Sequence, residues 1–304
     1  MGDAWPLIDY ERWAPTCDTL HAHTQVLGKL AVALAPPEPE LQHAALRLTA
    51  RGWETLPLPA PDGSGAFVAA LDLRAHQALV EHSRGAEARI ELAGERAVAD
   101  VTADLLEAIA DVAGVVQINM KPQEVTWTVP LDEDREHRTY DPDQVCDYFT
   151  AATRADLALA DYRAPFRGRS TPVNAWWGSF DLAVNLFSGE SAPPPSGDFI
   201  MRNAMDAQEI ASGWWPGDSN HPGAAFYAYA HPAPEGYDAA VLSAGTWSPE
   251  LGEYVLEWSD VVDADDPHEF AVRFMRETFA HACTVCDWAA ELAESGRGEI
   301  PAVR

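Results

Sequence analysis

The chain has 304 residues and a formal net charge of −28, from 20 Lys and Arg against 48 Asp and Glu. This surplus of negative charge repels phosphate backbones and anionic lipids, so we expect neither nucleic acid nor a membrane as partner. No apolar stretch has the length of a bilayer span, and the N-terminus lacks a signal-peptide pattern. These features predict a cytoplasmic protein.

The first half of the chain predicts a helix, a strand meander and a second helix. Leucines at positions 20, 27 and 30 recur at helical spacing, so we expect a helix over residues 17–35 that stops at Pro36-Pro37. Runs that favour strands follow at residues 44–53, 66–73, 76–82 and 88–92. A helix over residues 99–113, closed by Gly114, and an extended segment over residues 117–130 complete this half.

The second half repeats this order. Asp141-Pro142 opens a predicted helix over residues 142–163, because proline is favoured in the first turn of a helix. Predicted strands follow at residues 173–186, 225–231, 239–244 and 252–258, and a last helix covers residues 267–291. Meanders followed by helices indicate an α+β fold in two similar halves, residues 1–135 and 136–304, each an antiparallel sheet flanked by helices. The repeated order suggests an internal duplication.

The helix over residues 17–35 carries an unusual polar row. His21, Gln25 and Lys29 are spaced at i, i+4 and i+8, so they share one face of the helix. Lys29 is one of only two lysines in the chain. The row is either a solvated face or faces a site, in which case His21 and Lys29 are catalytic candidates and Gln25 binds the substrate.

Residues 132–137, Asp-Glu-Asp-Arg-Glu-His, form a charged connector between the halves. Such a run is usually solvated, but it also fits catalysis, or a metal ion held by His137 with carboxylates. Arg135 is a candidate for substrate binding, because a guanidinium holds a carboxylate through two hydrogen bonds. We assign no metal ligand and no cofactor, and the chain contains no glycine-rich phosphate-binding motif.

A strand-like run that begins at Trp176-Trp177 combines indoles with a hydroxyl and a carboxylate. Alternate residues of a strand share a face, so Trp177, Ser179 and Asp181 are predicted to point the same way. Asp181 is then a catalytic candidate, and Trp177 and Ser179 are candidates for substrate binding. The alternative is an Asp181 that accepts backbone N–H groups at a strand bulge.

A second aromatic group lies further along the chain. Flanking glycines indicate a pliant loop around Trp214-Trp215. Tyr227, Tyr229 and His231 alternate along a predicted strand and form an aromatic row with polar tips. This row fits a planar or sugar-like ligand, or the solvated face of a sheet. Glu209 is a catalytic candidate here, and Trp214, Tyr227 and Tyr229 are candidates for substrate binding.

Motifs with long, specific patterns occur along nearly the whole chain. They are Asp18-Thr19-Leu20-His21, Thr24-Gln25, Gly28-Lys29, the run from Asp132 to His137, Tyr140-Asp141, Trp177-Gly178-Ser179-Phe180-Asp181-Leu182-Ala183, Phe226-Tyr227-Ala228-Tyr229 and Pro249-Glu250-Leu251-Gly252-Glu253. Together they resemble the domain-of-unknown-function family 5996. The resemblance implies a full-length bacterial, largely actinobacterial family, and it implies no activity. Asn174 and Gln208 stand where the family pattern has histidines, so this member lacks part of the machinery if those histidines are working residues.

These features predict a small-molecule enzyme without a nucleotide cofactor, with acid/base chemistry in an aromatic-lined polar pocket between the halves. Asp181 or Glu209 would act with His21, and Lys29 or Arg135 would orient an anionic group. One alternative is a non-catalytic protein that binds a small molecule or a partner, and a second is a metal-dependent enzyme. The sequence specifies neither the reaction nor the oligomeric state.

Overall fold

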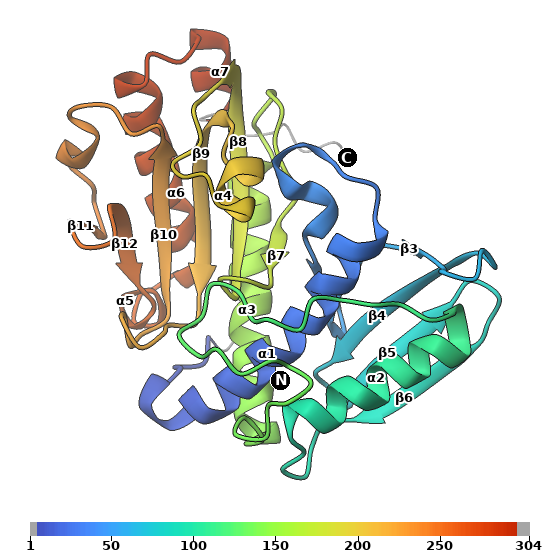
Figure 1. Ribbon diagram of the computed structural model, residues 1–304. Coiled ribbons are helices and arrows are strands. Elements are labelled where there is room, and N and C mark those ends of the chain that lie inside the picture. The colour runs from blue at the N-terminus through green and yellow to red at the C-terminus, as the bar shows by residue number, and fades with distance from the viewer. Residues whose placement is uncertain (1–4, 297–304) are drawn as a thin grey trace, which may run out of the picture. The chain divides into compact units, whose positions relative to one another are not determined.

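Helices and two antiparallel sheets of six strands each make up the protein, which confirms the predicted α+β class (Figure 1). The structure, a computed structural model, describes residues 5–296. Its residues divide into two compact units. The N-terminal unit comprises Asp9–Thr150 and Asn174–Asp181, and the C-terminal unit comprises Ala151–Val173 and the described parts of Met1–Ile8 and Leu182–Arg304. The division into domains 1–135 and 136–304 stays a prediction.

The sheet of the N-terminal unit is an antiparallel meander with the order β1-β2-β4-β5-β6, in which β3 pairs with β4. The register of the two central strands places Phe67 opposite His82 and Leu71 opposite Ala78. Phe67, Leu71 and Ala78 are fully buried, so this register fixes the core. The strands are β1 (Arg47–Leu48), β2 (Gly52–Glu54), β3 (Leu58–Pro59), β4 (Ala66–Asp72), β5 (Gln77–His82) and β6 (Glu87–Glu91).

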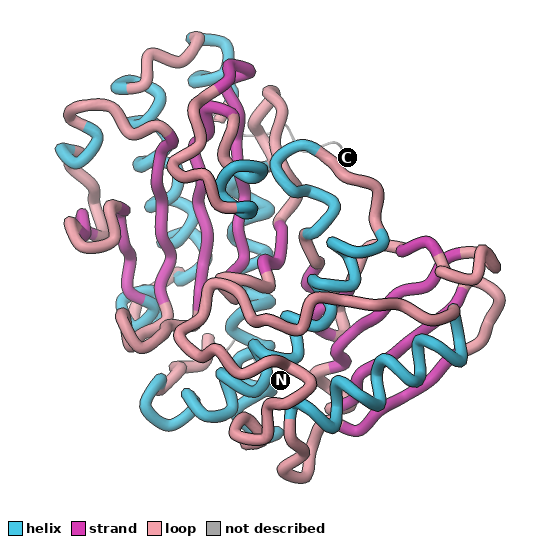
Figure 2. The backbone as a smooth tube through the Cα atoms, viewed as in Figure 1, coloured by secondary structure: helices cyan, strands magenta, loops and turns pink. Residues whose placement is uncertain are grey.

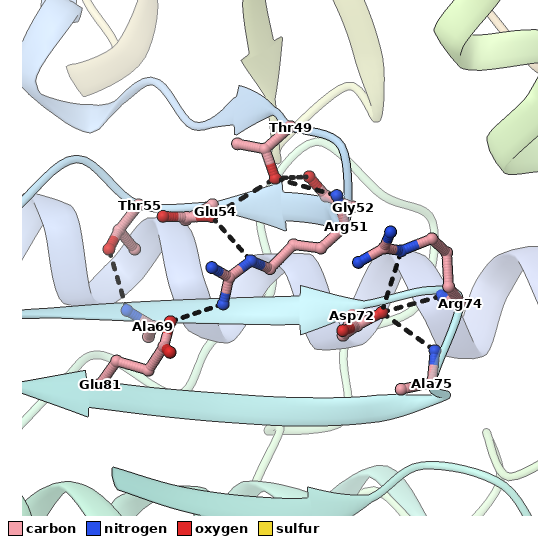
Figure 3. A network of polar contacts seen from close by, with 10 residues as sticks. All are labelled: Thr49, Arg51, Gly52, Glu54, Thr55, Ala69, Asp72, Arg74, Ala75 and Glu81. Atoms are coloured by element: carbon pink, nitrogen blue, oxygen red, sulfur yellow. Dashed lines mark hydrogen bonds and ion pairs between the residues drawn. The ribbon is translucent and has the colours of Figure 1, made fainter. Parts of the chain in front are cut away.

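Polar contacts hold the turns of this sheet in place (Figure 3). Arg51, in the turn between β1 and β2, contacts the carboxylate of Glu81 on β5 at 2.5 Å. Asp72, at the end of β4, accepts the backbone N–H groups of Arg74 and Ala75 at 3.0 and 2.9 Å. A carboxylate that accepts the N–H groups of its own turn stabilises that turn. The conformation of the turn then fixes the register of the two strands that it joins.

Two long helices belong to the same unit. α1 (Tyr10–Leu34) is buried on almost every side from Thr16 onward, and the 3₁₀ helix Pro39–Ala44 follows it. α2 (Val98–Ala113) buries one face, which includes Leu105 and Ile109, and packs on β5 and β6. It ends at Gly114, whose φ of 105° suits glycine, as predicted.

The second sheet has the strand order β11-β12-β10-β9-β8-β7, and most of it belongs to the C-terminal unit. Its strands are β7 (Asn174–Trp176), β8 (Asp181–Ser191), β9 (Ala207–Trp215), β10 (Ala225–His231), β11 (Thr246–Ser248) and β12 (Glu253–Glu257). The remaining helices are α3 (Pro142–Arg163), α4 (Phe199–Ala204), α5 (Trp258–Val262), α6 (Pro267–Val285), α7 (Ala290–Ser295) and the 3₁₀ helix Tyr237–Ala239.

α6 covers one face of the second sheet. It packs on β9, β10 and β12, and its Phe279 ring lies 6.3 Å from the ring of Tyr162 on α3. On β9, the Trp214 ring lies 5.5 Å from the ring of Trp258 on α5, which packs against α6. Ser212 and Trp214 therefore face the helices, while Glu209 and the other odd-numbered residues of β9 point to the opposite face.

The single strand predicted over residues 173–186 is wrong, because residues 177–180 form a turn between β7 and β8. Phe180 has a φ of 58°, a strained value for a residue with a side chain. Its ring stacks on four others, those of Trp13, His21, Trp53 and Tyr148, at centroid distances from 4.9 to 6.5 Å. Aromatic packing therefore outweighs strand continuity here, and Trp177, Ser179 and Asp181 do not share a strand face.

Other predicted boundaries also differ. The loop predicted around Trp214-Trp215 is part of the buried strand β9, because its glycine fits beneath the ring of Tyr227. The run at residues 44–53 breaks into β1 and β2. The strand predicted over residues 239–244 does not form, and the last helix divides into α6 and α7. The first helix begins at Tyr10, earlier than predicted, and continues through Pro15.

Candidate functional site

The polar row of α1 points into the N-terminal unit instead of into solvent. His21, Gln25 and Lys29 have exposed fractions of 8%, 0% and 3%. Residues of this kind are seldom buried without partners, because removing an amide or a charge from water is costly. Of the two readings open from the sequence, the solvated face is therefore contradicted. What each side chain can do then depends on its contacts.

His21 holds the turn at residues 177–180. Its Nε2 lies 3.0 Å from the carbonyl oxygen of Trp177 and 2.9 Å from that of Gly178. A carbonyl oxygen only accepts, so Nε2 carries the proton and donates it to these two groups. The imidazole also stacks on Phe180 at 4.9 Å. His21 is thus engaged in positioning the turn.

Gln25 fastens an irregular segment to α1. Its Nε2 donates to the carbonyl oxygen of Gln123 at 2.8 Å, and its Oε1 accepts the N–H of Gln123 at 3.0 Å. A weaker contact of 3.3 Å joins Nε2 to the carbonyl oxygen of Trp177. The buried amide therefore replaces the ladder bonds that a strand at residue 123 would have made.

Lys29 is the least satisfied member of the row. Its ammonium donates to the side-chain oxygen of Gln123 at 3.2 Å and lies 5.3 Å from the ring centroid of Trp177. Within residues 5–296 no carboxylate pairs with it. Burial lowers the pKa of Lys29 to about 8, because desolvation penalises the charged form.

The indole of Trp177 closes over α1 at Gly28. A Cβ atom added to Gly28 would lie 2.0 to 2.2 Å from atoms of that indole, so only glycine allows the contact. The Trp177 Nε1 donates to the carbonyl oxygen of Ala44 at 3.1 Å, which fixes the ring. Gly28, Lys29 and Trp177 therefore form one rigid arrangement in which the amine lies against an aromatic face.

Asp181 follows the same turn. It is 5% exposed, and the Ser179 hydroxyl donates to its Oδ1. Both residues belong to the N-terminal unit with His21 and Lys29. The short local contact fits an Asp that stabilises its own turn. The catalytic role of Asp181 and the binding role of Ser179 stay predictions.

Arg135 lies apart from the row. Its guanidinium side chain is 69% exposed and donates to both carboxylate oxygens of Asp100 on α2, at 3.0 and 3.2 Å. Asp134, which is fully buried, accepts the N–H groups of Glu136 and His137 and the His137 Nδ1 proton. The backbone carbonyl oxygens of His137 and Asp134 accept the N–H groups of Val98 and Ala99, so the charged connector caps the start of α2 and orders its own turn.

One titratable group extends the row beyond the residues that the sequence singled out. Asp18 lies one turn before His21, and burial raises the pKa of its carboxyl, which nearby His137 partly offsets. The indole of Trp127 lies between His21 and His137, at centroid distances of 5.4 and 4.8 Å. The i, i+3 spacing from Asp18 to His21 was the available signal, while Trp127 and Gln123 are too distant in sequence to be connected with it.

The C-terminal unit brings together a second set of predicted residues on the sheet face opposite α6. The carboxylate of Glu209, 3% exposed, accepts from Asn185 Nδ2 at 3.0 Å and from the Tyr229 hydroxyl at 3.3 Å. Tyr227 and Tyr229 stack at 6.2 Å with an interplanar angle of 4°, so two of the three residues of the predicted aromatic row lie together. Trp214 points to the opposite face, and the structure does not place it with Glu209.

The two positions at which the family resemblance implies histidines make ordinary polar contacts. Asn174 donates to Gln42 at 2.9 Å and accepts from Arg47. Gln208 accepts from the Ser188 hydroxyl at 3.1 Å. Among residues 5–296, no three His, Cys, Asp or Glu side chains are grouped to hold a metal ion. In the same range, no helix is both long and apolar enough to cross a membrane.

Comparison with known proteins gives one match. A family model described as "Family of unknown function (DUF5996)" matches residues 5–295. The match covers nearly the whole chain and confirms the resemblance seen in the sequence. No curated protein matches the chain, and no solved structure matches it.

Proposed function

The chain belongs to the family of unknown function DUF5996, and we propose that this member is a cytoplasmic enzyme that acts on a small molecule without a nucleotide cofactor. In this proposal the chemistry is acid/base chemistry, and Lys29 is the group that transfers the proton. His21 and Gln25 position the surrounding backbone. Asp181, in the same unit, remains a candidate for a second titratable group, and Glu209 of the C-terminal unit remains a separate catalytic candidate.

The observation that carries this proposal is the environment of Lys29. A buried ammonium normally has a carboxylate partner, since an unpaired buried charge is costly. Among the residues that the structure describes, Lys29 instead has one neutral amide oxygen and one aromatic ring as partners. An energetically costly arrangement of this kind is typical of a working residue more than of a structural one.

The chemistry follows from the pKa of Lys29, which burial lowers to about 8. A proton-transfer group works best when its pKa lies near the operating pH, because both protonation states are then accessible. An ordinary lysine, with a pKa near 10.4, is charged almost completely at neutral pH and is a poor base. Burial against Trp177 therefore makes Lys29 suitable both as a base and as an acid.

The test is turnover of small molecules by the purified protein and two Lys29 variants. Each protein is incubated with a cytoplasmic metabolite extract, and mass spectrometry records which compounds are consumed. Lys29→Met removes the amine, and Lys29→Arg keeps a charge that does not titrate near neutral pH. We expect both variants to lose about 10²-fold or more of the consumption rate, as loss of a general acid/base does.

Controls separate chemistry from folding. Circular dichroism and thermal unfolding must show that both variants remain folded. The proposal is wrong if no compound is consumed by the native protein, or if Lys29→Met consumes it as fast as the native protein does. A Lys29→Arg variant with full activity would limit Lys29 to electrostatic binding of the substrate.

A second candidate function, non-catalytic binding of a small molecule, is supported by the tyrosine row. Parallel stacked rings beside a buried carboxylate give an apolar surface with polar groups at its edge, as ligand sites have. Under this alternative, Tyr229→Ala would abolish retention of a co-purified metabolite, whereas Lys29→Met would retain it. Native mass spectrometry of the two variants distinguishes these outcomes.

A further inference from the structure

The segment that covers the polar row of α1, residues 115–130, has no regular structure. We call these residues the strap; Figure 2 draws it as loop. Exposure alternates along it, as in an extended chain, which agrees with the extended character expected from the sequence. Yet residues 115–130 make no strand pairing within the part of the chain that the structure describes.

Side chains of α1 take the place of a strand partner at the middle of the strap. The amide of Gln25 binds the backbone N–H and carbonyl groups of Gln123. The ammonium of Lys29 binds the side-chain oxygen of the same residue at 3.2 Å. These side-chain contacts replace the main-chain ladder of a strand, so we expect opening of the strap to cost less than opening of a strand within the sheet.

Glu124, the next residue of the strap, is also unusual. Its φ of 57° places it in the left-handed region, which disfavours residues with side chains. Its carboxylate lies over Gly178, where an added Cβ would be 1.9 Å from Oε2. The strap thus adopts a strained backbone at the point where it lies against the turn that His21 holds.

The Gln123 side chain gives Lys29 a neutral acceptor where a charged one would bind more strongly. A hydrogen bond from an ammonium to an oxyanion is roughly twice as strong as one to a neutral amide. The ammonium has three donor hydrogens, and within residues 5–296 one acceptor oxygen, that of the Gln123 side chain, binds it. Burial also gives this position a low dielectric constant, which strengthens the attraction between an ammonium and an oxyanion.

From these contacts we propose that Gln123 occupies the position of an oxyanion, and that the strap moves to let a small molecule with a carboxylate or phosphate group bind Lys29. This inference rests on the function proposed above and names the substrate class of that site. In the resting protein the Gln123 amide binds Lys29 through one hydrogen bond and keeps other molecules away. In the complex the oxyanion takes its place against Trp177.

The chain offers a clean experiment, because Lys29 and Lys121 are its only lysines. Lys121 lies on the strap and is exposed, so it reports on the intrinsic rate of amine modification. The folded protein is treated with acetic anhydride, a neutral reagent, and peptide mass spectrometry gives the acetylation rate of each lysine. Inorganic phosphate and acetate are the probes, with chloride at the same ionic strength as the control for screening.

Three variants complete the design. Gln123→Ala removes the acceptor oxygen, and Gln117→Ala, at an exposed position of the strap, is the matched control. Gln123→Glu places a carboxylate of the protein beside Lys29. Folding of each variant is checked by thermal unfolding before labelling.

We expect phosphate or acetate to slow acetylation of Lys29 at least severalfold without affecting Lys121. Gln123→Ala should acetylate faster at Lys29 and reach half-protection at a lower phosphate concentration than the native protein or Gln117→Ala. Gln123→Glu should react more slowly at Lys29 and show no further protection by either anion.

The inference is overturned if neither anion protects Lys29, or if Gln123→Ala behaves as Gln117→Ala does. It is also overturned if Lys29 stays unmodified in every folded variant while Lys121 reacts, because the strap then does not open. These results leave the metabolite experiment independent. If turnover depends on Lys29 but neither anion protects Lys29 from acetylation, only the proposed substrate class is refuted. If an anion protects Lys29 but the protein consumes no metabolite, only the proposed enzymatic function is refuted.

Discussion

Two nitrogen bases on α1 show how burial acts at the scale of single residues. Within the described residues, 5–296, Lys29 is buried with one hydrogen bond, and His23, 2% exposed, has no hydrogen-bond partner for either ring nitrogen. In both cases desolvation is the main cause that lowers the pKa. Lys29 lies in the polar row, whereas His23 is outside it and serves the core as a neutral ring, as a structural histidine does.

His23 predicts a loss of stability in acid. Burial, with Arg96 as a smaller cause, lowers the pKa of His23 to about 4 in the folded protein, from 6.5. Between these two pH values His23 takes up a proton in the unfolded chain but not in the folded protein. The contribution of His23 to the free energy of unfolding therefore falls as the pH drops from about 6.5 towards 4. The loss at the acid end is about 3 kcal/mol, from about 1.4 kcal/mol per pKa unit.

Urea unfolding at pH 7.5 and at pH 5 measures this effect. The variant His23→Leu should lose less free energy of unfolding between these two pH values than the native protein. His268→Leu, at an exposed histidine, should lose as much as the native protein. Equal pH dependence in the native protein and His23→Leu would contradict the account.

Gly28 predicts a packing effect that opposes helix propensity. Alanine is favoured over glycine by about 1 kcal/mol within a helix. Its Cβ, however, would lie 2.0 Å from the indole of Trp177, and overpacking of this kind costs about 1–3 kcal/mol. We expect Gly28→Ala to lower the free energy of unfolding and to speed acetylation of Lys29.

The matched control for that change is Gly197→Ala, where an added Cβ meets no atom within 4 Å. It should leave both the unfolding curve and the acetylation of Lys29 unchanged. If Gly28→Ala were as stable as the native protein, the close contact between α1 and the indole would not be a constraint on the site.

At the scale of elements, the strap and strand β9 differ in what holds their backbones in place. β9 is paired on both sides, with β8 and with β10, and is buried over most of its length. The strap depends on side chains, chiefly the buried amide of Gln25. Hydrogen bonds of the main chain should therefore protect β9 from exchange far better than the strap.

The variant Gln25→Leu tests this dependence. It leaves the N–H and carbonyl groups of Gln123 without their partner, at a cost of about 1–3 kcal/mol for each group that stays buried. We expect faster amide exchange over residues 115–130 and unchanged exchange in β9. Gln117→Leu, on the exposed side of the strap, should alter neither. Uniformly faster exchange in strap and sheet would mean that Gln25 supports the whole unit instead.

The same contrast explains which elements the sequence could predict. Strand β10 and helix α3 match the predicted ranges, because alternation and a first-turn proline are local signals. The turn at residues 177–180 is not a local signal. It exists because the ring of Phe180 packs with Trp13, Trp53 and other distant rings. A strand-like pattern of residues cannot reveal that packing.

The candidate site, like the fold, could be predicted from the sequence only where local spacing carries a signal. Helical spacing placed His21, Gln25 and Lys29 on one face, and the structure brings them together against Trp177. Their partner Gln123 lies 94 residues beyond Lys29, in a segment without a periodic signal, and could not be connected to them. Local spacing thus found one side of the site, and the other side comes from tertiary contacts.

At the scale of the whole molecule, the charge of −28 acts against the low pKa of Lys29, since surrounding anions favour an ammonium. Charges beyond about 8 Å are largely screened at physiological ionic strength. Desolvation acts at the amine itself and lowers the pKa of Lys29. Burial therefore outweighs the field of the acidic chain, and the site retains a titrating amine in a strongly anionic protein.

The most direct test of this account is the titration of Lys29, followed by acetylation rates from pH 6 to pH 11, with Lys121 as the reference in the same sample. We predict a midpoint of about 8 for Lys29, because burial lowers its pKa to that value. Lys29 should therefore gain reactivity well before an exposed lysine does. A midpoint near 10.4, the usual value for lysine, would show an ordinary ammonium and contradict the proposed role.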